Sequence, residues 1–114
     1  MRTVNSLALL LVFACYVPVV LAADAKVVIS SPAEGAKISP TSKIEVAFEA
    51  TPGANGDHVH LYVDDGKDAV VLRTLKGNHT LKPLAPGKHG ICVRLVNKGH
   101  AEVGAQDCVM FRVE

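Results

Sequence analysis

The feature that constrains the fold most strongly is a series of short segments separated by turns rich in glycine and proline. Within each segment, apolar and polar residues alternate. Beyond Lys26 no stretch repeats its apolar residues every 3.6 positions, so helices are not predicted. The segments instead show the two-residue alternation of strands that bury one face. Seven short strands at this spacing predict an all-β, antiparallel β-sandwich. The expected strands are residues 26–30, 43–49, 58–64, 69–75, 79–84, 89–97 and 107–113.

The segment before the first strand has the layout of a secretory signal peptide. A positive start at Arg2 precedes the almost wholly apolar run 7–21, and small residues follow. This run is shorter than the roughly 20 apolar residues that span a membrane. We therefore expect residues 1–23 to be cleaved. Residues 24–114 would remain as one periplasmic or secreted domain without a membrane span.

Charge and composition exclude several functions. The sequence has 12 basic and 11 acidic residues, and loss of Arg2 would leave the mature chain neutral. No basic patch indicates a nucleic-acid partner, and the few mature aromatic residues are too sparse for a sugar-binding platform. We see no nucleophile in a catalytic setting and no glycine-rich phosphate loop, so the sequence does not predict an enzyme.

Three cysteines occur, and they have different expected fates. Cys15 ends a stretch, VFAC, that loosely imitates a lipobox, so its lipidation is an open alternative. After export, Cys92 and Cys108 remain, and two cysteines in an oxidising compartment most simply form one disulfide. Strand alternation turns both away from the core on neighbouring strands, as a cross-strand bridge requires. If these cysteines lie opposite each other, Val96 faces Gly104 and the turn centres on residue 100.

The stretch LAPGKHGICVRLVN, residues 84–97, resembles the corner and the following strand of fibronectin type III and other immunoglobulin-like (Ig-like) domains. In those domains a corner tyrosine hydrogen-bonds to the backbone. His89 takes its place here, so the resemblance implies a structural role for this histidine. The stretch SPAEGAKIS is likewise similar to the first strand of many exported bacterial Ig-like modules. The resemblance implies a seven-stranded Ig-like sandwich.

The chain after residue 23 also resembles a group of exported bacterial domains that have no settled function. Their shared pattern is an H-x-H strand ending in aspartate, a G-x-H-T-L segment, a P-G-K-H corner and a late histidine. The matching residues here are His58, His60 and Asp64; Gly77, His79, Thr80 and Leu81; Pro86 to His89; and His100.

The Ig-like topology gathers four of the five histidines at one end of the sandwich. His58 and His60 begin the third strand, and the topology brings its start close to the connections that carry His79 and His100. Imidazole is the commonest metal ligand in proteins. Without free thiolates, such a cluster suits copper, or else zinc or nickel. We therefore expect a transition-metal site, most favourably for copper and otherwise for zinc, with His79 the less certain ligand.

The stretch HVH is also similar to the strand that carries two copper ligands in copper–zinc superoxide dismutases. The long metal-binding and electrostatic loops of that family have no counterpart here, so dismutase activity is not expected. Histidine is also an ordinary residue on the wet face of an antiparallel sheet. The alternative is therefore an Ig-like protein-binding or structural module of the cell envelope, without a metal.

Overall fold

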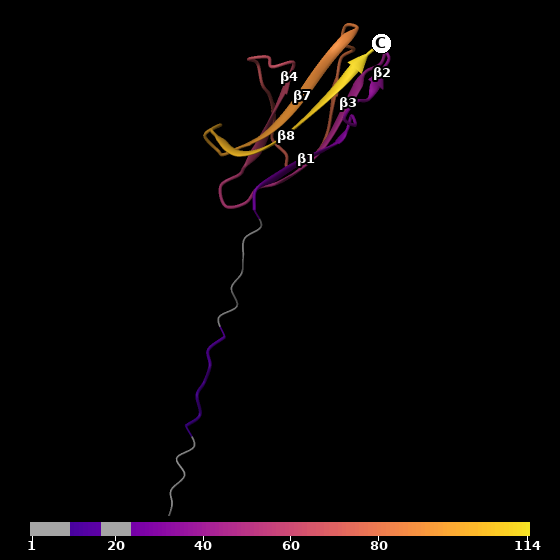
Figure 1. The fold of residues 1–114 in the computed structure, drawn as a ribbon. Coiled ribbons are helices and arrows are strands. Elements are labelled where there is room, and N and C mark those ends of the chain that lie inside the picture. The colour runs from indigo at the N-terminus through magenta and orange to yellow at the C-terminus, as the bar shows by residue number, and fades with distance from the viewer. Residues whose placement is uncertain (1–9, 17–23) are drawn as a thin grey trace, which may run out of the picture.

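The structure is a computed structural model, and it describes residues 10–16 and 24–114. The strands form two packed sheets (Figure 1). One sheet has the order β1-β3-β6, and the other has the order β2-β8-β7-β4-β5. All strand pairs are antiparallel except β2 with β8. The strands are β1 (Lys26–Ser31), β2 (Lys37–Ile38), β3 (Ile44–Thr51), β4 (His58–Val63), β5 (Val70–Leu72), β6 (Lys76–Leu81), β7 (Gly87–Val96) and β8 (Glu102–Val113).

The predicted all-β sandwich is confirmed. The core lies between the two sheets and contains the residues that the alternation assigned to it. Val46 and Phe48 of β3 face Leu61 of β4 and Val93 of β7 across this core, and all four are at most 3% exposed. Packing the two sheets against each other removes both apolar faces from water, and this burial is the main favourable term in folding.

Strand boundaries differ from expectation at several strands, most of all at β8, which begins at Glu102 instead of residue 107. The two-residue strand β2 was not predicted, and β5 is confined to three residues. The strand expected at residues 79–84 instead runs from Lys76 to Leu81 in the three-stranded sheet. Pro83 lacks a backbone N–H for the ladder, which fits a strand that ends before it.

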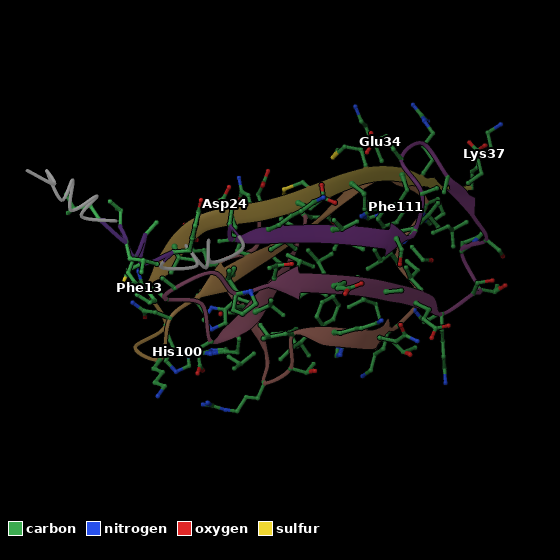
Figure 2. All side chains as sticks on the ribbon, turned by 90° about the horizontal axis from the view of Figure 1, so that it is seen from below. Phe13, Asp24, Glu34, Lys37, His100 and Phe111 are labelled. Atoms are coloured by element: carbon green, nitrogen blue, oxygen red, sulfur yellow. A yellow bond between two sulfur atoms is a disulfide. The ribbon has the colours of Figure 1, made fainter. Side chains whose placement is uncertain are left out.

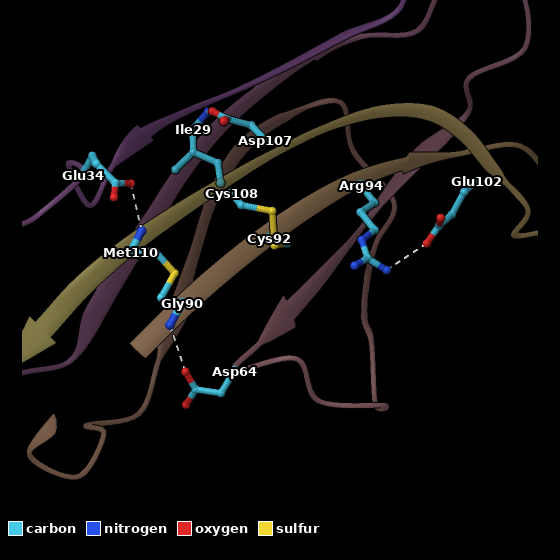
Figure 3. Close-up of a disulfide and its surroundings, with 10 residues drawn as sticks. All are labelled: Ile29, Glu34, Asp64, Gly90, Cys92, Arg94, Glu102, Asp107, Cys108 and Met110. Atoms are coloured by element: carbon cyan, nitrogen blue, oxygen red, sulfur yellow. Dashed lines mark hydrogen bonds and ion pairs between the residues drawn. A yellow bond between two sulfur atoms is a disulfide. The ribbon is translucent and has the colours of Figure 1, made fainter. Parts of the chain in front are cut away.

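The β7–β8 hairpin contains the disulfide. Cys92 pairs with Cys108, and the two side chains are bonded on the outer face of the sheet (Figure 3). This prediction is confirmed. The expected register holds from Gly87 through Arg94, but it then shifts, and Val96 pairs with Glu102 instead of Gly104. The shift is a bulge in β8 around Gly104, whose φ of 97° suits glycine.

The free edge of β1 is tied to the other sheet by a carboxylate. The backbone N–H of Ile29 donates to Asp107 Oδ2 over 2.8 Å (Figure 3). Asp107 pairs with Val93 in the ladder, so it lies on the core side of β8 at the sheet margin. The carboxylate of Asp107 therefore satisfies a backbone N–H of the edge strand β1 that has no partner within its own sheet.

The N-terminal segment shows no regular structure where it is described. Leu10 and Phe13 are more than four-fifths exposed, and Cys15 is a free, exposed cysteine. The expected cleavage site at Ala22 and Ala23 lies outside the described residues. Within the described ranges no helix is long and apolar enough to span a membrane.

Candidate metal centre

The connection between β3 and β4 sets the start of the histidine strand. Gly56 packs so closely that a Cβ there would lie 2.4 Å from the carbonyl oxygen of Pro52 and 2.7 Å from a methyl carbon of Leu95. The next N–H, of Asp57, donates to the carbonyl of Val96 over 2.8 Å. Strand β4 therefore begins beside the end of β7, directly below the β7–β8 turn.

The β7–β8 turn presents His100. The side-chain oxygen of Asn97 accepts hydrogen bonds from the N–H groups of Gly99 and Ala101, both over 3.0 Å. The N–H of His100 donates to the carbonyl of Asn97, and His100 adopts a left-handed φ of 65°. This conformation is uncommon for a residue other than glycine. The asparagine therefore holds the turn in the shape that brings His100 over β4.

Three imidazole nitrogens converge at this end of the sandwich, where Figure 2 shows His100 far from Glu34 and Lys37. His58 Nε2 lies 3.2 Å from His60 Nε2 and 3.2 Å from His100 Nδ1. His60 Nε2 lies 3.0 Å from His100 Nδ1. The expectation that His58, His60 and His100 share one end of the molecule is met, and their ligand atoms form a nearly equilateral triangle. We call this end the histidine pole.

Hydrogen bonding alone does not account for this triangle. The carboxylate of Asp57 accepts a hydrogen bond from His58 Nδ1 over 2.9 Å, so Nε2 of the neutral His58 ring carries a lone pair. Hydrogens on the facing nitrogens of His60 and His100 could then serve at most two of the three contacts. At least one pair of nitrogens meets without a hydrogen between them. A cation shared by all three lone pairs would satisfy every contact.

The histidine pair is buried rather than wet. His58 is 1% exposed and His60 is 7% exposed, whereas His100 is exposed. The alternative of an ordinary pair on a wet sheet face therefore does not describe these residues, because the β7–β8 turn covers this part of the outer face with His100. Burial lowers the pKa of His60 below its ordinary value, and the charges of His58 and His100 lower it further. A buried imidazole with a lowered pKa keeps its lone pair available to a metal.

His79 does not join the cluster. It was expected in a connection at the same end, but it lies inside β6, opposite Val46 of the three-stranded sheet. Only His58, His60 and His100 form a group with metal-binding spacing among the described residues. The error arose because β6 begins three residues earlier than expected, which moves His79 from a loop into mid-strand.

His89 has the structural role that its corner position predicted. Its Nε2 donates to the carbonyl of Ala85 over 2.6 Å, in the manner of a corner tyrosine. Its Nδ1 also donates to Asp64 Oδ2, a partner that strand alternation could not show. The hydrogen bond to Asp64, and then that to Ala85, raises the pKa of His89. We call this opposite end, with Asp64, Ala85 and His89, the corner pole.

Similarity to known proteins is found in the fold. No family model and no curated protein matches the sequence. The fibronectin(III)-like modules of Clostridium thermocellum CbhA align with a TM-score of 0.64 at 18% identity, over 77% of this chain and 96% of that one. The fold is that of a fibronectin type III-like sandwich. The extracellular domain of a putative one-component system from B. thetaiotaomicron aligns with a TM-score of 0.58 at 9% identity, over 80% of this chain and 16% of that one.

These likenesses confirm the Ig-like architecture that the corner sequence predicted. At such low identity they show the fold alone. Neither of the two structures is described as a superoxide dismutase, so the local similarity of HVH to that family gains no support.

Proposed function

We propose that this protein is an exported fibronectin type III-like module that binds one transition-metal ion, most favourably copper, at the histidine pole. The observation that carries the proposal is the triangle of imidazole nitrogens with sides of 3.0–3.2 Å. With metal–nitrogen bonds of about 2.0–2.1 Å, an ion equidistant from the three atoms would lie about 1 Å from their plane. The triangle therefore has the size of one face of a metal coordination shell.

The second shell supports the same proposal. A ligating histidine usually donates its other ring N–H to a carboxylate or carbonyl, which fixes the ring and its tautomer. Asp57 is such a partner for His58, because its carboxylate accepts from Nδ1 and leaves Nε2 for the ion. One side-chain contact therefore both orients the ring and supplies a negative charge close to the site.

The donor set favours copper(II) over copper(I). Three imidazoles suit Cu(II), Zn(II) and Ni(II), and Cu(II) generally binds such sites most tightly. A thioether would favour Cu(I), but Met110 pairs with Gly90 near the corner pole, away from the three histidines. Metal holding or delivery, rather than catalysis, is the activity that we propose for this site.

Calorimetry on the purified, tag-free protein tests this function. We expect binding of one equivalent of Cu(II), with weaker binding of Zn(II). The variant His58→Ala/His60→Ala should lose at least about a hundredfold in affinity, because second-shell changes alone cost 10- to 100-fold. His79→Gln is the matched control, since it removes a histidine outside the cluster and should leave affinity unchanged. Equal affinity in the wild type and the double variant would reject the metal site.

The second candidate is a module that contacts a protein of the cell envelope without a metal. The likeness to fibronectin(III)-like modules and to an extracellular domain favours it. If calorimetry shows no metal uptake by the folded wild-type protein, this second function becomes the better one.

A further inference from the structure

The three histidines leave part of a metal's coordination shell open. With bonds of about 2.0–2.1 Å, nitrogens 3.0–3.2 Å apart subtend about 100° at the ion, close to one face of a tetrahedron. Cu(II) and Zn(II) bound in this way need at least one more donor. Among residues 10–16 and 24–114, no further His, Cys, Asp or Glu joins the group. The open position is therefore available to a ligand from solution.

The carboxylates near the cluster already accept hydrogen bonds from other groups. Asp57 accepts from His58 Nδ1, the ring nitrogen that does not face the cluster. Glu102 accepts a hydrogen bond from Arg94 Nη1 over 3.0 Å (Figure 3). The guanidinium of Arg94 also lies over the ring of Tyr62, 4.6 Å from its centroid. Each of the two acids therefore already has a partner outside the group of three ligand atoms.

Solutes can approach the site from the side of His100. His58 and His60 are buried, so the sheet and its neighbours close their side of the triangle. His100 is exposed and sits on a turn. A small molecule from solution would therefore reach the ion past the β7–β8 turn.

One cation, Arg73, acts on this part of the site beside the ion-paired Glu102. Val71 of β5 is the ladder partner of His60 and lies on the outer face. Arg73 follows directly after β5, two residues beyond Val71, and its positive charge acts on His60. Within the described part of the chain Arg73 forms none of the ion pairs. Its guanidinium is therefore available to a ligand of the metal.

We infer that the metal bound at the histidine pole takes a small anion as its exogenous ligand, with Arg73 as the second group that holds this anion. The inference rests on the proposed metal site. A dication with three neutral imidazoles keeps its full charge, and an anion that contacts both the ion and a guanidinium gains two charge-assisted interactions.

Azide is a suitable probe because its binding to Cu(II) produces a charge-transfer absorption band. Copper uptake of each variant is measured first, by calorimetry, and the copper-loaded protein is then titrated with azide. We expect saturable binding of one azide per copper, with competition from chloride and acetate. Arg73→Gln should weaken azide binding about tenfold through the lost charge-assisted contact. Lys82→Gln, which removes an exposed cation elsewhere, should not weaken it.

The outcomes separate the two proposals. Failure of copper to bind at all rejects the proposed function before any azide is added. Stoichiometric copper binding without a charge-transfer band rejects the open position for an anion. Equal azide affinity in the wild type and Arg73→Gln rejects the role of Arg73.

Discussion

The two ends of strand β4 use the same side chain in opposite ways. At the histidine pole, His58 and His60 meet another imidazole, and burial with neighbouring like charge lowers the pKa of His60. At the corner pole, His89 lies between a carboxylate and a carbonyl oxygen, and its pKa is raised. Imidazoles that face one another keep their lone pairs for a cation. An imidazole between two oxygen acceptors holds both protons, so it is positively charged and donates a hydrogen bond to each oxygen.

The largest expected effect concerns the disulfide, which joins β7 to β8 between the two poles (Figure 3). Replacing Cys92 and Cys108 by serine should lower the free energy of unfolding by about 3 kcal/mol, the chain-entropy value for a loop of this size. Urea unfolding of the variant and of the wild type measures the difference. An unchanged unfolding midpoint would contradict a structural role for the bridge.

Acidification should separate the two poles. Ligand histidines bind a metal only when neutral, so affinity should fall as pH drops through about 6.5. Because the pKa of His60 is lowered, we expect a loss smaller than the roughly thousandfold that three unperturbed ligands would give between pH 7.5 and pH 5.5. Competition calorimetry at both pH values, with a chelator of known proton dependence, gives the ratio of the two metal affinities. A pH-independent affinity would contradict coordination by imidazoles.

The orienting carboxylate of the histidine pole should have a smaller effect. Asp57→Ala removes the acceptor for His58 Nδ1 but leaves all three ligands in place. We expect a 10- to 100-fold loss of copper affinity, which is the usual range for such partners. Asp65→Ala is the matched control, because it removes an exposed carboxylate near the corner pole. Equal copper affinity of Asp57→Ala and the wild type would show that Asp57 does not orient His58 for metal binding.

The smallest expected effect is at the corner pole. His89→Gln loses hydrogen bonds to Asp64 and Ala85, and we expect a loss of about 1.5 kcal/mol in the free energy of unfolding at pH 6. The raised pKa fixes the sign of the pH dependence. The contribution of His89 is fully present below the unfolded value near 6.5 and disappears as pH rises through the higher folded pKa.

Unfolding curves of His89→Gln and the wild type should therefore converge above the folded pKa of His89. Lys88→Gln, an exposed neighbour, should follow the wild type throughout. A gap that widened with rising pH would show that His89 is neutral in the folded protein.

Local patterns predicted much of the fold and of the candidate site. Alternation alone placed Leu61 and Val93 in the core and turned Cys92 and Cys108 to the outer face, since side chains of a strand take alternate faces. It also placed His58 and His60 on one side of β4. The Ig-like resemblance supplied the topology that brings His100 to the same end.

The remainder depended on features that a two-residue alternation does not encode. The bulge at Gly104 moves the β7–β8 turn by one position, and only the folded ladder shows the shift. The burial of His58 follows from coverage by a turn that is distant in sequence. The position of His79 was missed because a strand beginning at Lys76 carries few apolar residues, which weakens the signal for its start.

The contact between Asp107 and the N–H of Ile29 also bears on how this protein behaves at high concentration. An unpaired strand edge is a template on which a second chain can add its own strand and begin an aggregate. On β1 the middle of that edge is already bonded to a carboxylate, so an incoming strand would have to displace a charged group and leave it without its partner. One acidic side chain therefore helps to keep neighbouring molecules from joining edge to edge.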